Sequence, residues 1–289
     1  GLVYEETSGE ITITGYTGMV EKVEIPAEIE GKSVTKIADM AFMVSNTPNN
    51  TIIKKITIPN SVTTIGAGVF FGCSNLQEIV FPENVSIPSA ASMFRDCVAL
   101  QSITLPITLT EIGNSMFQNC TSLINVNFPS DNQIETIGDA AFESCILLSE
   151  IILPEKLRLI KTQAFQNCTS LSEIILPENL EKIEAQAFQN CVNLTDITIY
   201  DKVTSISTSA FNNIPKEQLT IHGIAGSYAN TFATTNGYAF EVVQTGDDLI
   251  TTYLQAKIDE AKGLDPTLYT KESYANLLTA IAHAEQVLE

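Results

Sequence analysis

The residues of this chain with the most reactive side chains are its six cysteines, and a cysteine closes a five-residue block, AFQNC, that occurs twice. The two copies are Ala164–Cys168 and Ala187–Cys191, so the block recurs at an interval of 23 in the numbering. Catalytic thiolates or thiolate ligands of a metal would make such copies a paired site. If the cysteines are instead structural, the constant interval between them is the more important observation, because a fixed interval indicates a repeat architecture.

All six cysteines keep nearly the same interval. Successive positions differ by 24, 23, 25, 23 and 23 along the series Cys73, Cys97, Cys120, Cys145, Cys168 and Cys191. In a stack of coils, equivalent residues form one file, and cysteine packs as a small buried hydrophobe. Coils about 4.8 Å apart would place neighbouring Cα atoms within disulfide range, but parallel side chains in a packed column disfavour the bond. We therefore expect a structural cysteine ladder rather than three disulfides or a reactive thiol site.

The other residues capable of chemistry form no recognisable constellation. The two histidines, His222 and His283, have no Cys, Asp or Glu at the spacing of zinc ligands. The sequence contains no phosphate-binding P-loop, no GxGxxG and no GxSxG nucleophile motif. Carboxylate pairs are abundant, but nothing marks one pair as a glycosidase site. We therefore predict a protein that is not an enzyme, with no catalytic residue, no metal site and no cofactor.

Composition and charge narrow the classes of partner. The chain has 289 residues, of which 44% are hydrophobic, so it can bury a sizeable core. Its 15 basic and 34 acidic residues give a net charge of −19, which repels nucleic acid and anionic membranes. No apolar run is long enough to insert into a membrane, and no signal peptide opens the chain. We predict neither a nucleic-acid partner nor direct membrane insertion.

The interval of the cysteines is shared by two other residue types. Phenylalanines recur at intervals between 23 and 28 in the numbering: Phe42, Phe70, Phe94, Phe117, Phe142, Phe165, Phe188 and Phe211. Prolines recur at intervals between 23 and 25: Pro59, Pro82, Pro106, Pro129, Pro154 and Pro177. The consensus LxxIxLPxxLxxIxxxAFxxCxx predicts two short extended stretches and an inward-facing helical or 3₁₀ turn in each coil. One coil cannot bury its apolar face alone, so we predict a solenoid of about eight coils with short parallel strands and short helical turns.

These motifs resemble the BspA-like leucine-rich-repeat family of bacterial surface proteins over about residues 10–243. Residues 10–42 resemble the family's first coil, and residues 221–243 resemble its closing cap. Three coils depart from the consensus: the first carries the insertion SNTPNN and lacks the cysteine, the third has Pro88 in its second strand, and the last has Ile214 in place of cysteine. The resemblance implies a leucine-rich-repeat solenoid over residues 1–243, located outside a bacterial cell or on its surface, although the sequence itself contains no signal peptide.

Residues 244–289 follow a different pattern. After the linker QTGDD, apolar residues at helical spacing predict one helix from Asp248 and a second from Thr270, separated by GLDP. The two helices resemble the first two helices of the FIVAR-type three-helix module found in extracellular bacterial proteins. We therefore expect a two-helix hairpin from a truncated three-helix bundle, in a fragment of a longer modular protein.

The outward positions of the first extended stretch contain the candidate ligand-binding face. One column of the repeat ends in three carboxylates, those of Glu150, Glu173 and Asp196, and the neighbouring column includes Ile152 and Ile175. An acidic stripe beside exposed isoleucines could bind a protein. Alternatively, β-branched residues simply suit strands and the acids keep the sheet soluble. A calcium site is disfavoured, because a straight column does not bring six to eight oxygens together.

The sequence thus favours a non-catalytic extracellular binding or adhesion module. It would present a rigid repeat sheet to an extracellular protein or a glycan. One alternative is a structural spacer in a larger modular surface protein. Another is a carbohydrate-recognition or hydrolysing protein whose active module lies outside residues 1–289. The lack of Trp, and the placement of most of the eight Tyr near the ends of the chain, leave few platforms on which a sugar could stack.

Overall fold

The computed structural model describes residues 1–43 and 52–243, together with residues 255, 258, 259, 261–263, 277, 278 and 281. The chain divides into two units, Gly1–Glu241 and Val242–Glu289. The insertion SNTPNN and the linker QTGDD lie outside the described residues. No helix in the described part of the chain is long and apolar enough to cross a membrane.

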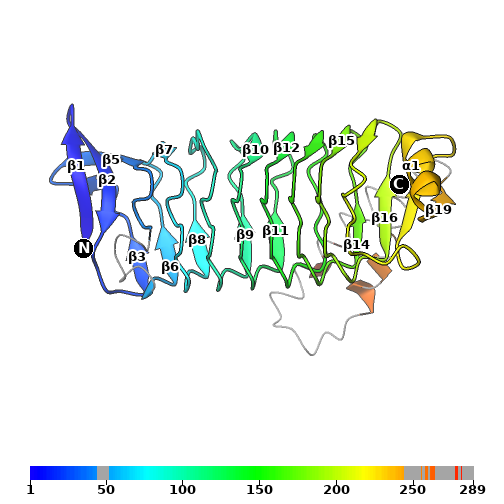
Figure 1. Ribbon diagram of the computed structural model, residues 1–289. Coiled ribbons are helices and arrows are strands. Elements are labelled where there is room, and N and C mark those ends of the chain that lie inside the picture. Colours follow the sequence, from blue (N-terminus) through cyan, green and yellow to red (C-terminus); the bar gives the residue numbers. More distant parts are fainter. Residues whose placement is uncertain are drawn as a thin grey trace. The chain divides into compact units, whose positions relative to one another are not determined.

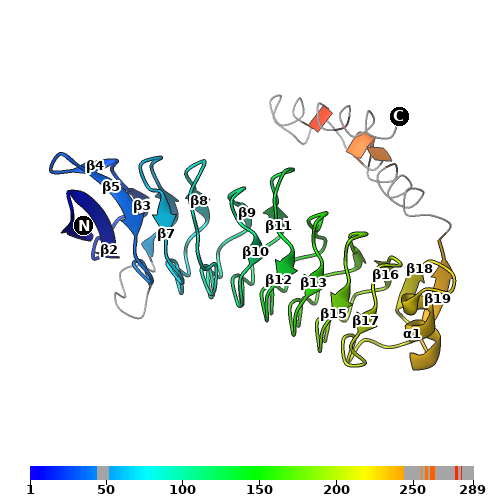
Figure 2. The same ribbon diagram turned by 90° about the horizontal axis from the view of Figure 1, so that it is seen from above.

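The first unit is a leucine-rich-repeat β-solenoid of about 10 turns, whose coils follow one another along a single direction (Figures 1 and 2). The prediction of about eight coils, which rested on the eight repeat phenylalanines, was too low. Most coils contribute one strand to each of two faces. We name these the first-strand face and the second-strand face, after the order of the two strands within a coil.

The first-strand face contains short, mostly parallel strands that end where the prolines of the repeat begin. These strands are β3 (Lys22–Glu24), β6 (Lys55–Thr57), β8 (Glu78–Val80), β9 (Ser102–Thr104), β11 (Asn125–Asn127), β14 (Glu173–Ile175), β16 (Asp196–Ile199), β18 (Thr220–Gly223) and β19 (Ala239–Val242). Hydrogen bonding joins them in the orders β3-β6-β8, β9-β11 and β14-β16-β18-β19. The register places Lys55 beside Glu78, and Glu173 beside Asp196, as the repeat spacing predicts.

The second-strand face is formed mainly by strands of two residues. Its strands are β7 (Thr64–Ile65), β10 (Glu111–Ile112), β12 (Thr136–Ile137), β13 (Leu159–Ile160), β15 (Lys182–Ile183) and β17 (Ser205–Ile206). The last five form one parallel sheet in chain order. The second residue of each strand is a buried isoleucine, so each strand anchors its coil to the core.

The AFxxC blocks form hydrogen-bonded turns that do not continue as an α-helix. Of the two predicted alternatives, helical or 3₁₀, their bonds match the 3₁₀ pattern, in which an amide donates to the carbonyl three residues earlier. The amide of Cys191 donates to the carbonyl of Phe188 at 3.1 Å, and the amide of Phe188 donates to Ala210 in the next coil at 2.8 Å. Each of these turns holds two residues at positive φ, such as Gln186 at 58° and Asn190 at 62°. A residue in this left-handed conformation ends any helix, and asparagine tolerates it better than most residues do.

The core is a continuous file of apolar side chains inside the coils. All eight repeat phenylalanines are buried, and their neighbouring ring centroids lie 5.2 to 5.8 Å apart. From Phe70 to Phe211 the neighbouring rings are nearly parallel, with interplanar angles of 3° to 14°. Each coil therefore buries its phenylalanine only by stacking on its neighbours, which is the arrangement expected of a solenoid.

The N-terminal end of the file is covered by a sheet. This sheet contains β1 (Leu2–Thr7), β2 (Glu10–Tyr16), β4 (Glu28–Ile29) and β5 (Lys32–Ile37), and β5 also pairs with β7. Strands β1 and β2 are antiparallel, whereas β2 runs parallel to β5. The ring of Tyr16 stacks on Phe42 at 5.6 Å, so an aromatic residue of the first coil extends the phenylalanine file.

A helix covers the C-terminal end of the file. Helix α1 (Tyr228–Asn236) begins after Ser227, whose side chain accepts a hydrogen bond from the amide of Asn230, and ends at Gly237 with φ 78°. Both residue types are favoured at these positions, because serine caps orphan amides and glycine adopts positive φ without strain. Phe232 and Tyr238 pack edge-on against Phe211, at 6.1 and 5.9 Å between centroids.

The second unit has few described residues. Those from Gln255 to Lys262 are helical, as are Leu277, Leu278 and Ile281, and the side chains of Ile258 and Ile281 are buried. Most of the two predicted helices lies outside the described residues. Among the described residues, α1 is the only complete helix, so a helical hairpin is not shown.

Candidate ligand-binding face and cysteine ladder

The six cysteines lie in one file in the interior of the solenoid. All are free thiols whose side chains are fully buried. Each Sγ donates a hydrogen bond to the carbonyl oxygen of the repeat phenylalanine one coil earlier. The pairs, 3.0 to 3.3 Å apart, are Cys73–Phe42, Cys97–Phe70, Cys120–Phe94, Cys145–Phe117, Cys168–Phe142 and Cys191–Phe165.

This contact gives the thiol a structural role that an alanine could not fill. The phenylalanine carbonyl already accepts the amide of the cysteine in its own coil, as Phe94 does from Cys97 at 3.0 Å, and the S–H group of the next coil adds a weak second donor inside the core. Burial also raises the pKa of Cys73 and of Cys191 to about 12. At neutral pH these thiols therefore stay protonated, which is the opposite of what a catalytic or metal-binding cysteine needs.

The predicted binding residues lie on the first-strand face. Strand β14 carries Glu173 and Ile175, which pair with Asp196 and Thr198 of β16. Glu150 and Ile152 occupy the equivalent positions of the preceding coil, which forms no strand there. That coil is nevertheless held in the stack by a hydrogen bond from the amide of Ser172 to Ser149 at 3.3 Å.

Exposure differs among these residues. The side chain of Ile152 is 79% exposed, whereas Ile175 is half-buried. Glu150 and Glu173 are exposed. The sequence analysis also missed exposed apolar residues on this coil and the one before it, among them Leu147 at 47% and Ile124 at 49%. A comparison of repeat columns could have found them, because the other complete coils have polar or small residues at both positions.

The partner of Asp196 is a histidine of the closing cap. The Nε2 atom of His222 lies 2.8 Å from Asp196 Oδ1, and its Nδ1 atom lies 3.5 Å from Glu241. Partial burial raises the pKa of Asp196, whereas hydrogen bonds from His222 and Thr195 lower it. The lowering effects together outweigh the effect of burial, so the pKa of Asp196 lies below its ordinary value. The histidine ties the end of the carboxylate column to β18 and β19.

The sequence analysis missed this contact because it searched for partners only at short spacing. His222 lies 26 residues from Asp196 in the chain. The strand register pairs His222 with Thr198, which lies two residues after Asp196. Aligning the repeat columns would therefore have shown that His222 lies close to Asp196. In the described part of the chain, no group of three or more His, Cys, Asp or Glu side chains is arranged to hold a metal ion.

Comparison with known proteins gives one family. The sequence model described as BspA type leucine rich repeat region matches in six copies, over residues 18–91, 35–169 and 86–220. No curated protein matches the chain.

Solved structures show similar folds. A leucine-rich repeat protein from Bacteroides ovatus is 23% identical, with a TM-score of 0.51 over 84% of this chain and 75% of that one. A leucine rich cell surface protein from Faecalibacterium prausnitzii is 20% identical, with a TM-score of 0.38 over 84% of this chain and 93% of that one. The pneumococcal vaccine antigen PcpA is 17% identical, with a TM-score of 0.43 over 78% of this chain and 80% of that one. The likeness to the first structure shows the fold alone.

Proposed function

Because the chain belongs to the BspA-type leucine-rich-repeat family, we propose that it is a surface module that binds an extracellular protein through its first-strand face. Repeat regions of this kind are typically non-catalytic. The location outside the cell is part of the proposal. The proposal also divides the chain into two parts. Residues 1–243 form the solenoid with its cap at 221–243, and residues 244–289 form a separate helical segment that resembles part of a FIVAR-type module.

The exposure of Ile152 is the observation that carries this proposal. A single exposed apolar side chain is ordinary in a soluble protein. Here, however, Ile152 lies 79% exposed in a coil that also exposes Leu147, and carboxylates of the same face lie beside it. An apolar centre with a charged rim is the arrangement found in protein–protein interfaces.

The charge of the face indicates the chemistry of its partner. Glu150 and Glu173 are exposed on neighbouring coils, and the chain as a whole carries a net charge of −19. A basic protein surface would be attracted by this field and would find complementary charges at the rim. An apolar side chain at the centre of that surface would cover Ile152. The stacked coils are already ordered before binding. The loss of conformational entropy on binding is therefore small, and little of the interaction energy is needed to offset it.

The proposal is tested by charge reversal on the full chain. Binding of the wild-type protein and of the double variant Glu150→Lys/Glu173→Lys would be measured against a panel of purified basic extracellular-matrix proteins. We expect the wild type to bind at least one of them and the variant to lose roughly tenfold or more in affinity, as expected for two contacts at a charged rim.

A matched control reverses the same amount of charge elsewhere. The variant Glu5→Lys/Glu28→Lys changes two exposed glutamates of the N-terminal sheet and should bind like the wild type. If the wild type bound none of the panel, or if the Glu150/Glu173 variant bound as tightly as the wild type, the first-strand face would not be the binding site. A structural spacer would then be the better account of the solenoid.

A further inference from the structure

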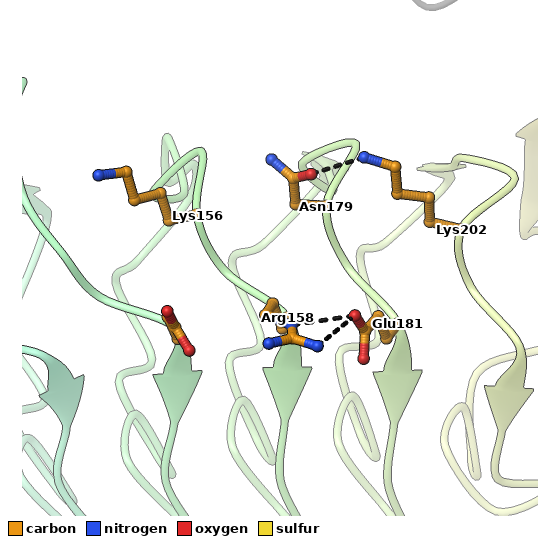
Figure 3. A pocket seen from close by; sticks show the side chains of 6 residues that line it. Lys156, Arg158, Asn179, Glu181 and Lys202 are labelled. Atoms are coloured by element: carbon orange, nitrogen blue, oxygen red, sulfur yellow. Dashed lines mark hydrogen bonds and ion pairs between the residues drawn. The ribbon is translucent and has the colours of Figure 1, made fainter.

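A pocket opens on the second-strand face of the solenoid (Figure 3). Its side chains come from successive coils and form two rows. The turn row contains Lys156, Asn179 and Lys202, from the turns that follow the first strands. The strand row contains Glu135, Arg158 and Glu181, each of which immediately precedes a second strand. Because each row repeats one position of the coil, the pocket is a groove that runs along the stack.

The strand row contains two carboxylates and one guanidinium, so it has no excess positive charge. Arg158 donates from Nε at 2.9 Å and from Nη2 at 2.7 Å to the same oxygen, Oε1 of Glu181. These hydrogen bonds raise the pKa of Arg158, and the negative charge of Glu135 on the other side adds to the effect. The row therefore presents hydrogen-bonding groups but little free positive charge.

The turn row keeps its positive charge. Lys156 Nζ donates to the amide oxygen of Gln133 at 2.7 Å, and Lys202 Nζ donates to that of Asn179 at 2.7 Å. Both acceptors are neutral. In the described part of the chain neither ammonium group forms an ion pair, whereas Lys54 does so with Glu21 at 2.8 Å. Two uncompensated cations thus flank one amide at the rim of the pocket.

We propose that this pocket binds an acidic polysaccharide. Lys156 and Lys202 lie two coils apart, so each ammonium group holds a different carboxylate or sulfate group along the sugar chain. Sugar hydroxyls donate to Glu135 and accept from the amide of Asn179, since hydroxyl groups do both. The pocket is lined by six residues, none of them aromatic, so stacking on a sugar ring contributes nothing and charge has to supply the affinity.

The periodicity of the groove favours a polymer over a single sugar. Coils joined by strand ladders lie about 4.8 Å apart, which is close to the length of one sugar ring. A polysaccharide lying along the stack therefore meets an equivalent side chain on each coil. A nucleic acid fits less well, because its evenly spaced phosphates would face Glu135 and Glu181 as well as the lysines.

The test uses the full chain and three defined probes. Binding would be measured at low ionic strength to oligogalacturonate, which carries carboxylates, to dextran sulfate, and to neutral dextran. We expect binding to one or both acidic probes but not to dextran, and the pattern identifies the anionic group that is recognised. The variant Lys156→Gln/Lys202→Gln should bind roughly tenfold more weakly, as expected for two exposed ionic contacts.

A matched control removes two lysines far from the groove. Lys22→Gln/Lys36→Gln changes two exposed residues of the N-terminal coils and should bind like the wild type. Several results would overturn the proposal: no binding of either acidic probe, equal binding of dextran, an unaffected Lys156/Lys202 variant, or an equal loss in the control. This site is separate from the proposed protein-binding face, so Glu150→Lys/Glu173→Lys should retain polysaccharide binding.

Discussion

The AFQNC block shows how one residue can serve the core and the backbone at once. The cysteine is small enough to pack in a file, and its S–H group reaches the phenylalanine carbonyl of the previous coil, as in Cys120 and Phe94 at 3.0 Å. The asparagine beside it adopts positive φ, which lets the chain turn toward the next strand. The block is repeated because every coil makes the same turn and offers the same carbonyl to the thiol of the next coil.

The buried thiols predict a loss of stability at alkaline pH. Unfolded cysteines ionise near pH 8.5, whereas burial raises the pKa of Cys73 and Cys191 to about 12 in the folded protein. The folded pKa is the higher of the two, so the stabilisation is complete below about pH 8.5 and is lost as pH rises toward 12. Each thiol contributes at most about 1.4 kcal/mol per pH unit within that window.

The measurement is the urea midpoint at pH 8 and at pH 10. We expect the midpoint to fall, and we expect Cys120→Ser to show a smaller pH dependence, because that variant has one thiol fewer. The native protein should also resist alkylation at pH 8 and react fully once it is unfolded. A midpoint that does not change between the two pH values, or rapid labelling of the folded chain, would contradict this account.

At the scale of the element, the turn depends on a conformation that few residues adopt. Asn190 has φ 62°, its Nδ2 donates to Asn167 Oδ1 at 2.7 Å, and its own Oδ1 accepts from Asn213 at 2.8 Å. The side-chain amides thus form a second ladder parallel to the cysteines. It holds neighbouring turns in register at the positions where the backbone is least favourable.

Asn190→Val should therefore destabilise the protein. A β-branched residue at positive φ costs roughly 1–2 kcal/mol, and the two amide hydrogen bonds are lost in addition. Asn190→Gly separates the two effects, because glycine keeps the conformation without strain and loses only the amides. We expect the free energy of unfolding, measured with urea, to decrease in the order wild type, Asn190→Gly, Asn190→Val. If both variants lost the same amount, the backbone would not be the source of the cost.

These elements also show how far the sequence alone could lead. Equal spacing predicted the strand register and the phenylalanine file, because equivalent residues of stacked coils must meet. The turn was predicted as helical or 3₁₀ from the spacing of Ala187, Phe188 and Cys191, and its hydrogen bonds are of the 3₁₀ kind. The preference of asparagine for positive φ, which ends the turn at Asn190, was overlooked. Two features were missed for the same reason: the contact between His222 and Asp196, and the pocket. Each brings together residues from different columns or coils, and a search for local motifs does not compare residues so far apart in the chain.

At the scale of the whole solenoid, the coils expose different charges on their two faces. In the C-terminal coils, the first-strand face exposes Glu150 and Glu173, whereas the pocket on the second-strand face combines three cationic side chains with two carboxylates. One chain can therefore offer two chemically different surfaces, although its net charge is −19. This division is possible because the core uses the inward positions of each coil and leaves the outward columns free to vary.

The same construction predicts how the solenoid unfolds. Each coil packs only on its neighbours, so stability is approximately a sum of coil and interface contributions. Phe142→Ala removes a ring from the middle of the file, where it stacks on Phe117 at 5.3 Å and on Phe165 at 5.2 Å. Such a truncation costs roughly 3–5 kcal/mol. We expect it to uncouple the coils on the two sides, so that urea unfolding splits into two transitions.

Phe42→Ala is the matched control, because Phe42 lies near the N-terminal end of the file, between Tyr16 and Phe70. Its loss should fray only the first coils and leave one main transition for the rest. Hydrogen exchange would locate the coils that open in each variant. If Phe142→Ala unfolded in a single transition and lost protection evenly along the chain, the coupling would extend beyond neighbouring coils, and a sum over nearest neighbours would not describe this solenoid.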